Sequence, residues 1–518
     1  MVSTLPASHR SPSALLIIPL ALSLIKFLIH ATLNFDGGYG MFRDELYYIA
    51  CAAKPALGYV DHPPLSAILL KLNIMLFGDS LFSIRLIPAV CAALTVWFTG
   101  LMTIRLGGGR WAVFFASLFT FSLGNFVMSS FYSMNSIEIL SWTLAAYLIV
   151  LIMQTEEKKY WVILGIVLGL GLLNKIGVLF LGAGIFAGLI FTGERKWLAT
   201  PWPYVSGAIA FLVFLPYIIW NVQHDWAHLE FIRNASENKY SGLSIISFLN
   251  GQLLLNSPVA ILVWLPGLFA LIFAPYFKRW RMLAFLYVIP LVILLFNKTS
   301  KDVYLLPAYS VLWAAGGIWL EKLVQQFRFA KVFAGVLIIL WGASTIIFIP
   351  LVLPVLPVQD YIVYAEKLGM KPESAEGKQL GELPQFYADM FGWEEKAKSV
   401  AEVYHALPEN DKANVSIYSD NYGRCAAIDY YGKDLGLPLS IGSHNNYWMW
   451  GPGERRGDPL IILGGSPESH AKVYQEVTLM TTSDCQYCMP YEDNVPVYLC
   501  RGFKVELKSV WPEIKHFE

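Results

Sequence analysis

Ionisable side chains are concentrated in one short segment near the start of an otherwise apolar chain. Residues 42–69 read FRDELYYIACAAKPALGYVDHPPLSAIL and lie between two apolar runs. The groups in question are Arg43, Asp44, Glu45, Lys54, Asp61 and His62. A carboxylate held at the depth of a membrane is costly and usually marks a functional site. We expect Asp44 to be either an interfacial acid paired with Arg43 or Lys54, or a general base that faces a cavity.

The composition indicates a membrane protein with many spanning segments. The chain has 518 residues, of which 56% are hydrophobic and 15% charged, whereas a soluble domain averages roughly 25% charged residues. The mean hydropathy is +0.51. The formal net charge is zero, so the overall charge indicates no nucleic-acid partner.

A spanning helix needs about 20 apolar residues, and this requirement predicts about eleven transmembrane helices. They are expected near 12–32, 82–104, 111–128, 137–154, 160–174, 176–192, 203–220, 249–274, 282–297, 303–321 and 332–353. The first is predicted to be an uncleaved helix, because no small-x-small cleavage pattern follows it. The split within 160–192 rests on Asn174 and Lys175, which interrupt the apolar run.

Lysine and arginine in alternate loops predict the orientation. With the N-terminus in the cytoplasm, every inner loop is basic, as the positive-inside rule requires. Residues 33–81 then form the first outer loop, and an odd number of spans puts the tail outside. In that loop we expect two short helices lying at the membrane surface. Asp61 is predicted to cap the second helix, because Pro63 is tolerated in a first helical turn.

The composition changes sharply near Pro354, which divides the chain into a membrane domain (1–353) and an extracytoplasmic domain (354–518, here called the tail). Residues 360–410 look helical and polar. The stretches VSIYSD, PLIILGG and VPVYLCRGFKVEL, between residues 415 and 507, are typical of short strands bounded by turn residues. The tail is therefore predicted to be a small α/β or α+β domain.

Two spacings resemble metal or redox motifs. Cys485-x-x-Cys488 lacks a second pair or a nearby histidine that would complete a zinc site, so we expect one disulfide or none. His224 and His228 stand four residues apart without an evident third ligand, and interfacial histidines beside tryptophan are commoner than metal pairs. No metal ligand is predicted, and a divalent-cation cofactor is left open.

Several motifs resemble a known family. The pattern FRDELYYIACA…GYVDHPPL…LFGDSLFSIRL is similar to the start of the bacterial family 39 glycosyltransferases of the GT-C fold, which resemble protein O-mannosyltransferases and lipid A aminoarabinose transferases. The similarity continues through FYSMNSIEILSWTLAAYL, LGLLNKIGVLFL, LPYIIWNVQHDWAHLEF and KDVYLLPAYSVLWAAGG, over most of residues 35–320. The resemblance implies a polytopic α-helical GT-C protein in a bacterial inner (plasma) membrane.

The resemblance also implies an activity and two acids. Such a transferase takes a sugar from a polyprenyl-phosphate carrier and passes it to a lipid, glycan or protein acceptor on the outer side. Asp44 matches the family acid that serves as catalytic base, and Glu45 follows the family's Asp-Glu pair. A second family acid usually lies where Asn135 stands, so Glu138, one turn later, is our substitute. The alternative for Glu138 is an acid favoured by the helix dipole.

The remaining candidates are the groups that would bind the donor phosphate, whose charge grows as it leaves. Lys175 matches a family lysine that contacts donor phosphate; alternatively it extends to the membrane interface. His62 stands where related transferases often have lysine, and imidazole is a weaker cation near neutral pH. Four further candidates, Arg233, Lys298, Lys301 and Tyr304, are included because they are predicted to lie on the same outer side.

The sequence thus predicts an inverting membrane glycosyltransferase whose partners are a polyprenyl-phosphate sugar, an outer acceptor and membrane lipids. The alternative is a lipid-linked sugar flippase or carrier without transferase activity. Transporters often show repeated halves with broken helices at the membrane midplane. Here no repeat is evident, and the acids cluster in one outer loop. These features favour the enzyme.

Overall fold

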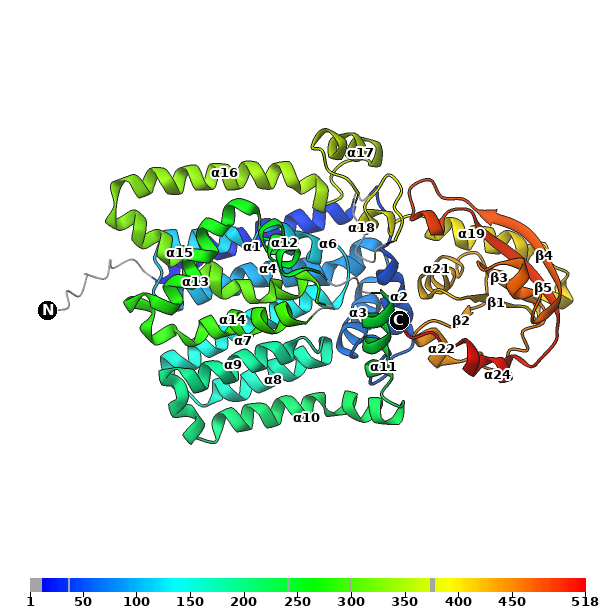
Figure 1. Cartoon of the computed structure of the whole chain (residues 1–518), viewed down its shortest axis with the longest axis horizontal. Helices are drawn as coiled ribbons and strands as arrows, with labels where there is room; N and C mark the ends of the chain where they lie inside the picture. Colours follow the sequence, from blue (N-terminus) through cyan, green and yellow to red (C-terminus); the bar gives the residue numbers. More distant parts are fainter. Residues whose placement is uncertain (1–11, 36–37, 240–242, 298–299, 373–377) are drawn as a thin grey trace.

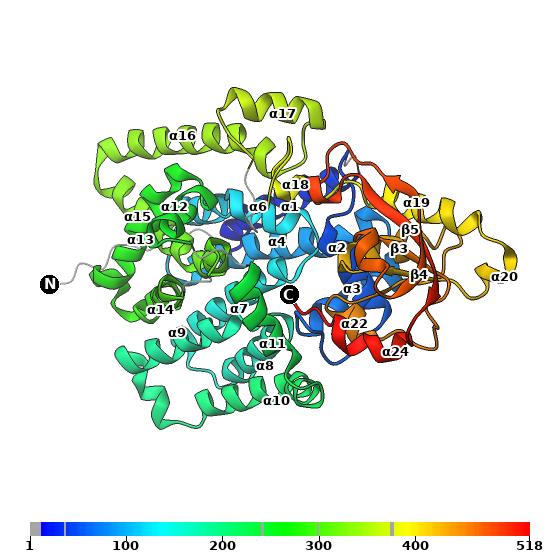
Figure 2. The ribbon, with the colours of Figure 1, turned by 45° about the vertical axis from the view of Figure 1, so that its right-hand side comes forward.

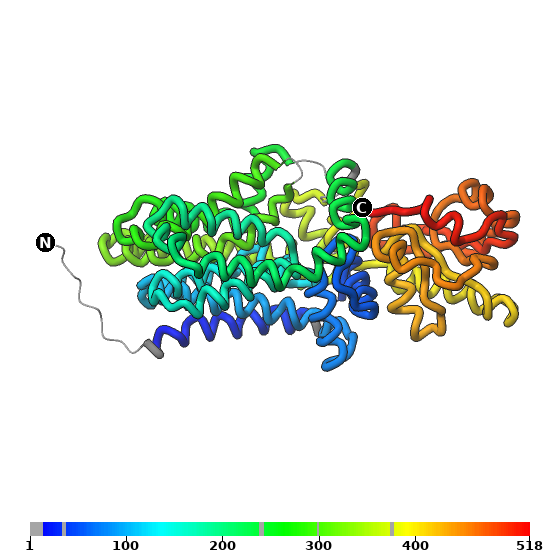
Figure 3. Tube along the Cα trace, turned by 90° about the horizontal axis from the view of Figure 1, so that it is seen from below, coloured from blue at the N-terminus to red at the C-terminus, as the bar shows by residue number. Residues whose placement is uncertain are grey.

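The computed structural model describes residues 12–518 except 36–37, 240–242, 298–299 and 373–377. Long helices run side by side along the long axis of the molecule, and a mixed sheet with its own helices forms the other end (Figure 1). Figure 3 shows the same arrangement from below, with the first helices of the chain along one side of the bundle.

Every predicted spanning segment contains a helix. The helices of this part are α1 (Pro12–Phe35), α4 (Leu81–Arg105), α5 (Arg110–Phe119), α6 (Leu123–Ser130), α7 (Met134–Thr155), α8 (Lys159–Asn174), α9 (Val178–Phe191), α10 (Trp202–Gln223), α11 (Ala227–Asn234), α12 (Ile245–Leu255), α13 (Ile261–Phe273), α14 (Met282–Phe296), α15 (Tyr309–Gln326) and α16 (Arg328–Val352). Within the described residues, six helices are long and apolar enough to cross a membrane, or up to nine if each bent pair is one span. The helices α8 and α14 are shorter apolar ones.

Two predicted spans are broken rather than continuous. The helices α5 and α6 meet at 56°, and the chain bends by 98° between α12 and the helix that follows it. In the second case Ser257 has a left-handed φ of 63° and Pro258 begins a short 3₁₀ turn. Proline has no N–H to continue the preceding helix. Hydropathy alone does not register such a break, which is why the sequence predicted one span.

The first outer loop contains two short helices, as expected. They are α2 (Arg43–Ala53) and α3 (Leu65–Phe77). The predicted role of Asp61 as a helix cap is wrong, because α3 begins two residues beyond Pro63 and its N-cap residue is Pro64, without a side-chain cap. The Asp61 carboxylate instead accepts a hydrogen bond of 2.9 Å from the Tyr47 hydroxyl.

The tail contains a five-stranded sheet in the order β2-β1-β3-β5-β4. Its strands are β1 (Ser416–Ser419), β2 (Ile441–Gly442), β3 (Leu460–Leu463), β4 (Tyr474–Ser483) and β5 (Val495–Phe503). β1 pairs in parallel with β2 and β3, whereas β5 is antiparallel to β3 and β4. The three predicted strands correspond to β1, β3 and β5. β4 was missed because it is an edge strand whose side chains are mostly exposed, so it lacks an apolar run.

Helices of the tail surround the sheet and reach the first outer loop. They are α17 (Val358–Lys367), α18 (Gln385–Ala388), α19 (Trp393–His405), α20 (Glu409–Lys412), α21 (Tyr422–Tyr431), α22 (Asn446–Trp450), α23 (Pro467–His470) and α24 (Leu507–Val510). Figure 2 shows α2 and α3 between the long helices and the sheet. Hydrogen bonds fix this contact: the Arg43 amide donates to the Asp389 carbonyl (2.9 Å), and the Val60 amide to the Asn446 side chain (2.7 Å).

Candidate functional site

A cavity of about 300 Å³ lies where the first outer loop meets α7, α9 and α11. Most of its lining is apolar. Its polar and ionisable lining residues are Asp61, Glu138, Lys175, His228, Ser236, Asn297 and Tyr304. We call it the Lys175 cavity. It brings together three residues predicted from the sequence, Glu138, Lys175 and Tyr304, with two that were assigned other roles, Asp61 and His228.

Lys175 reaches this cavity because the chain is extended between α8 and α9. Its φ and ψ of −157° and 131° end α8. The Lys175 ammonium then donates to Asn135 Oδ1 (2.8 Å) and Glu138 Oε2 (2.7 Å), and lies 5.0 Å from the centre of the Tyr304 ring. An ammonium has three N–H groups, and two acceptors on α7 hold this one in place at the cavity wall.

The Glu138 carboxylate packs against Gly177. A Cβ added to Gly177 would lie 2.5 Å from Glu138 Oε1, closer than any real carbon–oxygen contact of this kind. The Glu138 side chain is 5% exposed and that of Lys175 is 15% exposed. In such a setting the attraction between the two charges is much stronger than in water. The pair is therefore a fixed feature of the cavity wall.

Asp61 and His228 form another side of the cavity, and sequence reasoning missed both. His228 Nδ1 is 2.9 Å from the Val60 carbonyl oxygen. Burial lowers the pKa of His228, which the Val60 hydrogen bond and nearby Asp61 only partly oppose. His224 instead bonds the Trp220 carbonyl, so these two histidines are each held by backbone. The Asp-His-Pro-Pro motif could have indicated Asp61, since prolines immobilise the backbone beside it.

Asp44 is not among the residues that line this cavity. Its side chain is 38% exposed and accepts a 2.8 Å hydrogen bond from the hydroxyl of Tyr422 on α21. The Tyr422 ring packs against Tyr47 at 4.8 Å, and the Tyr47 hydroxyl donates to Asp61. A pair of tyrosines thus joins Asp44 on one side to Asp61, and hence to the Lys175 cavity, on the other.

Glu45 and His62 are buried in the protein and do not line the cavity. Both Glu45 oxygens are bound by Arg85, at 2.9 and 2.8 Å, and one also accepts from the Tyr132 amide at 2.7 Å. His62 is 1% exposed, packs between aromatic rings, and has Nδ1 2.8 Å from the Pro63 carbonyl. These contacts stabilise the loop.

Two other predicted cations that the structure describes are not brought to the cavity. Arg233 is exposed on α11, and Lys301 is half-buried before the 3₁₀ turn Asp302–Ala308; neither lines it. Lys298 lies outside the described residues. In the described ranges, no three His, Cys, Asp or Glu side chains form a group that could hold a metal ion.

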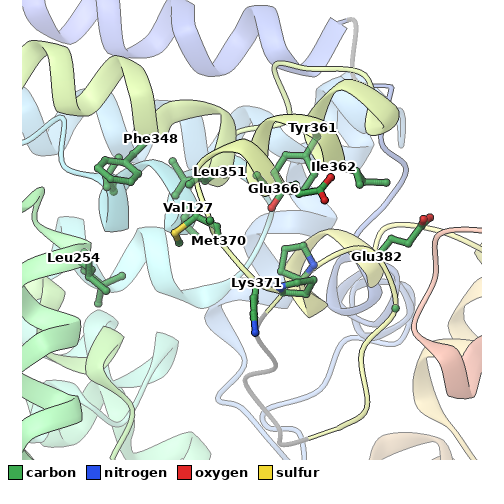
Figure 4. Close-up of a pocket in the computed structure, with 18 of the residues that line it drawn as sticks. Val127, Leu254, Phe348, Leu351, Tyr361, Ile362, Glu366, Met370, Lys371 and Glu382 are labelled. Carbon is green, nitrogen blue, oxygen red and sulfur yellow. The ribbon is translucent and has the colours of Figure 1, made fainter.

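A second, larger cavity of about 650 Å³ lies between α6, the C-terminal ends of α12 and α16, and helix α17. Its walls are mainly apolar, with Val127, Phe348 and Leu351 among them, and the tail adds the charged residues Lys371 and Glu382 (Figure 4). Val127 and Tyr361 also belong to a packed cluster that contains Phe42, the residue before Arg43. We call this space the α16 cavity.

The chain is similar to a family model, to another protein sequence and to solved structures. Residues 61–220 match the family model for dolichyl-phosphate-mannose-protein mannosyltransferase. The lipid A galacturonosyltransferase RgtD of Rhizobium johnstonii is 25% identical over 356 residues, which is 66% of this chain and 73% of that protein. The crystal structure of ArnT from Cupriavidus metallidurans bound to undecaprenyl phosphate has a TM-score of 0.63 at 12% identity, covering 94% of this chain and 98% of that one.

The apo structure of the same ArnT gives a TM-score of 0.62 over the same shares. The structural match extends over both the helical part and the tail, so the two chains share one architecture from end to end. The family model covers the region from Asp61 to Trp220, which includes Glu138 and Lys175. Together these similarities support the class predicted from the sequence, a membrane glycosyltransferase with the GT-C fold.

Proposed function

We propose that the protein transfers a sugar from a polyprenyl-phosphate donor to an acceptor on the outer side of a bacterial inner membrane, with inversion at the anomeric carbon. The observation that carries this proposal is the Lys175 cavity, where one oriented ammonium and two acids meet beside apolar side chains. The ammonium suits a leaving phosphate, whose charge grows in the transition state. Neighbouring apolar surfaces suit a prenyl chain.

In the proposed reaction the acceptor hydroxyl attacks the anomeric carbon while the bond to the phosphate oxygen breaks. The hydroxyl proton passes to Asp44, and the electron pair of the broken bond leaves with polyprenyl phosphate. Exposure of the Asp44 side chain supports this role, because a base must reach the acceptor directly. Asp61 and Glu138 orient the donor and Lys175.

The division into a membrane domain (1–353) and an outer tail (354–518) belongs to the same proposal.

Asp44→Asn tests the base. We expect turnover to fall by at least about 100-fold, the low end for removal of a general base, with normal folding and insertion. The measurement is release of polyprenyl phosphate from a labelled polyprenyl-phosphate sugar in detergent. Asp79→Asn is the matched control, because Asp79 is an exposed acid of the same loop that pairs with Lys433. Near-normal turnover of Asp44→Asn would refute the assignment, and no release by the wild type would favour a flippase.

The α16 cavity favours a lipid as the acceptor. It is mostly apolar, and several of its lining residues pack in the cluster that contains Phe42, two residues before Asp44. We propose that it receives an acyl chain of the acceptor, while Lys371 faces the anionic head group. A glycan or a protein acceptor would have no use for an apolar space of this size.

Filling the cavity tests this idea. Leu351→Trp should raise the KM for a lipid acceptor by roughly tenfold, because excluding two methylene groups from an apolar site costs about 1.6 kcal/mol. Leu340→Trp is the control, since Leu340 is on the same helix and 51% exposed. Equal KM values for the two variants would exclude the α16 cavity as the acceptor site.

A further inference from the structure

The tail contains a pair of cysteines that the proposed reaction does not use. Cys485 and Cys488 lie in the segment that joins β4 to β5. The Cys488 thiol donates to the Cys485 carbonyl oxygen at 3.3 Å, which holds its sulfur near Cys485. Cys485 is half-exposed, whereas the other five cysteines are buried. One sulfur of the pair is therefore open to a reagent and the second lies directly behind it.

The surroundings of Cys485 favour its reactive form. A Cβ added to Gly392 would lie 2.7 Å from the Cys485 sulfur and 3.1 Å from the Lys396 ammonium, so thiol and ammonium share a space that glycine leaves open. The hydrogen bond from Cys488, with a smaller contribution from Lys396, lowers the pKa of Cys485 to about 7. The thiolate is the nucleophile in exchange with disulfides.

The segment that carries this pair also contacts the side chain next to Asp44. Lys396 donates to the Glu492 carbonyl (2.8 Å), and Arg424 Nε donates to the Glu492 carboxylate (2.9 Å). One residue earlier, the Tyr491 hydroxyl accepts from Arg43 at 3.4 Å. Arg43 in turn lies 3.5 Å from Asp44. A movement of the 484–494 segment would therefore be transmitted to Asp44, the proposed base, by the Arg43 side chain.

We infer that Cys485 and Cys488 are a redox-active pair whose disulfide fixes the 484–494 segment against Arg43. The oxidant is a disulfide-bonded thiol–disulfide exchange protein. The Cys485 thiolate attacks its disulfide and releases one thiolate. The Cys488 thiol then gives its proton to this released thiolate, attacks the Cys485 sulfur and releases the partner's second sulfur as a thiolate, which leaves one new disulfide and one reduced partner. The effect on sugar transfer rests on the proposed function, whereas formation of the disulfide does not.

Peptide mapping tests the disulfide without any activity assay. Membranes from aerobic cells expressing the full chain are treated with an alkylating reagent, unfolded, reduced and treated with an isotopically heavy form of the same reagent. We expect the heavy label on both Cys485 and Cys488. When the sample is instead unfolded in the presence of the first reagent, Cys425 and Cys500 should carry the light label. Light label on both Cys485 and Cys488 would overturn the inference, as would a metal ion bound to the pair.

Treatment with a reductant tests whether the disulfide affects turnover. Dithiothreitol should lower wild-type turnover several-fold, and the Cys485→Ser, Cys488→Ser double variant should show that lower turnover with and without reductant. Cys500→Ala is the control and should respond to reductant like the wild type. If the disulfide forms but reductant does not change turnover, the proposed effect of the disulfide through Arg43 is refuted. If the wild type releases no polyprenyl phosphate in either condition, the proposed function fails and the mapping result stands.

Discussion

Asp44 and Glu45 are adjacent in sequence but are placed for different tasks. The Asp44 side chain is partly exposed, whereas Glu45 is completely buried and is held by the Arg85 guanidinium on α4. A carboxylate without solvent access and with both oxygens occupied cannot easily bind a substrate. We therefore interpret Glu45 as the residue that fixes α2 to the membrane helices and keeps Asp44 at the loop surface.

Arg85→Met should destabilise the protein strongly. It leaves the buried Glu45 carboxylate without its cation, and breaking a buried ion pair in this way costs about 3–5 kcal/mol. The measurement is the thermal unfolding midpoint in detergent. The double variant Glu45→Gln, Arg85→Met should recover part of the loss, because the uncompensated charge is gone. If Arg85→Met unfolds at the wild-type midpoint, Glu45 has no such structural role.

At the scale of helices, the break between α8 and α9 creates the Lys175 cavity. A continuous helix would carry Lys175 past α7, whereas the extended residue directs its ammonium to Asn135 and Glu138. Gly177, immediately before α9, leaves the space that Glu138 occupies. The cavity thus depends on a local interruption of two apolar helices as well as on the first outer loop.

Gly177→Ala should displace the Glu138 carboxylate and release Lys175. We expect turnover to fall roughly tenfold, because losing a hydrogen bond to a charged group costs about 1.5–3 kcal/mol. The control is Gly182→Ala on the same helix, where an added Cβ meets no atom within 4 Å. Both variants are compared by release of polyprenyl phosphate. Equal turnover of the two would show that the position of Glu138 does not matter.

At the scale of the whole molecule, the tail contacts the loop that carries Asp44, the proposed base. The Tyr422 hydroxyl on α21 donates to Asp44, while the Asn446 side chain accepts from the Val60 amide beside Asp61. Hence two elements of the tail contact the short stretch that carries both acids. The tail positions the membrane residues as well as covering them.

Tyr422→Phe isolates this contribution, because it removes one hydroxyl and keeps the ring against Tyr47. We expect turnover to fall about tenfold, the effect of losing a hydrogen bond of about 1.5 kcal/mol to a charged group, with an unchanged unfolding midpoint. Tyr404→Phe, at a tyrosine on α19 remote from Asp44, is the control. A turnover equal to that of the control would mean that the tail does not act on Asp44.

The sequence predicted the class of fold well because its strongest signals are long apolar runs and basic loops. It also gave Glu138, Lys175 and Tyr304 as candidates; the structure brings them to one cavity, and their roles stay predictions. It misjudged Asp61, because a carboxylate before Pro-Pro is equally typical of a helix cap. It could not reveal that Arg85 pairs with Glu45 or that Tyr422 contacts Asp44, since these partners are 40 and 378 residues apart in sequence.

The position of Tyr422 across Asp44 restricts the route by which an acceptor arrives. A rigid globular substrate descending from the aqueous side would collide with the tail before any of its hydroxyls came near the carboxylate. On the proposed function, we therefore expect the acceptor to arrive sideways within the leaflet. A slender, membrane-embedded sugar recipient should then reach Asp44 more readily than a bulky dissolved one.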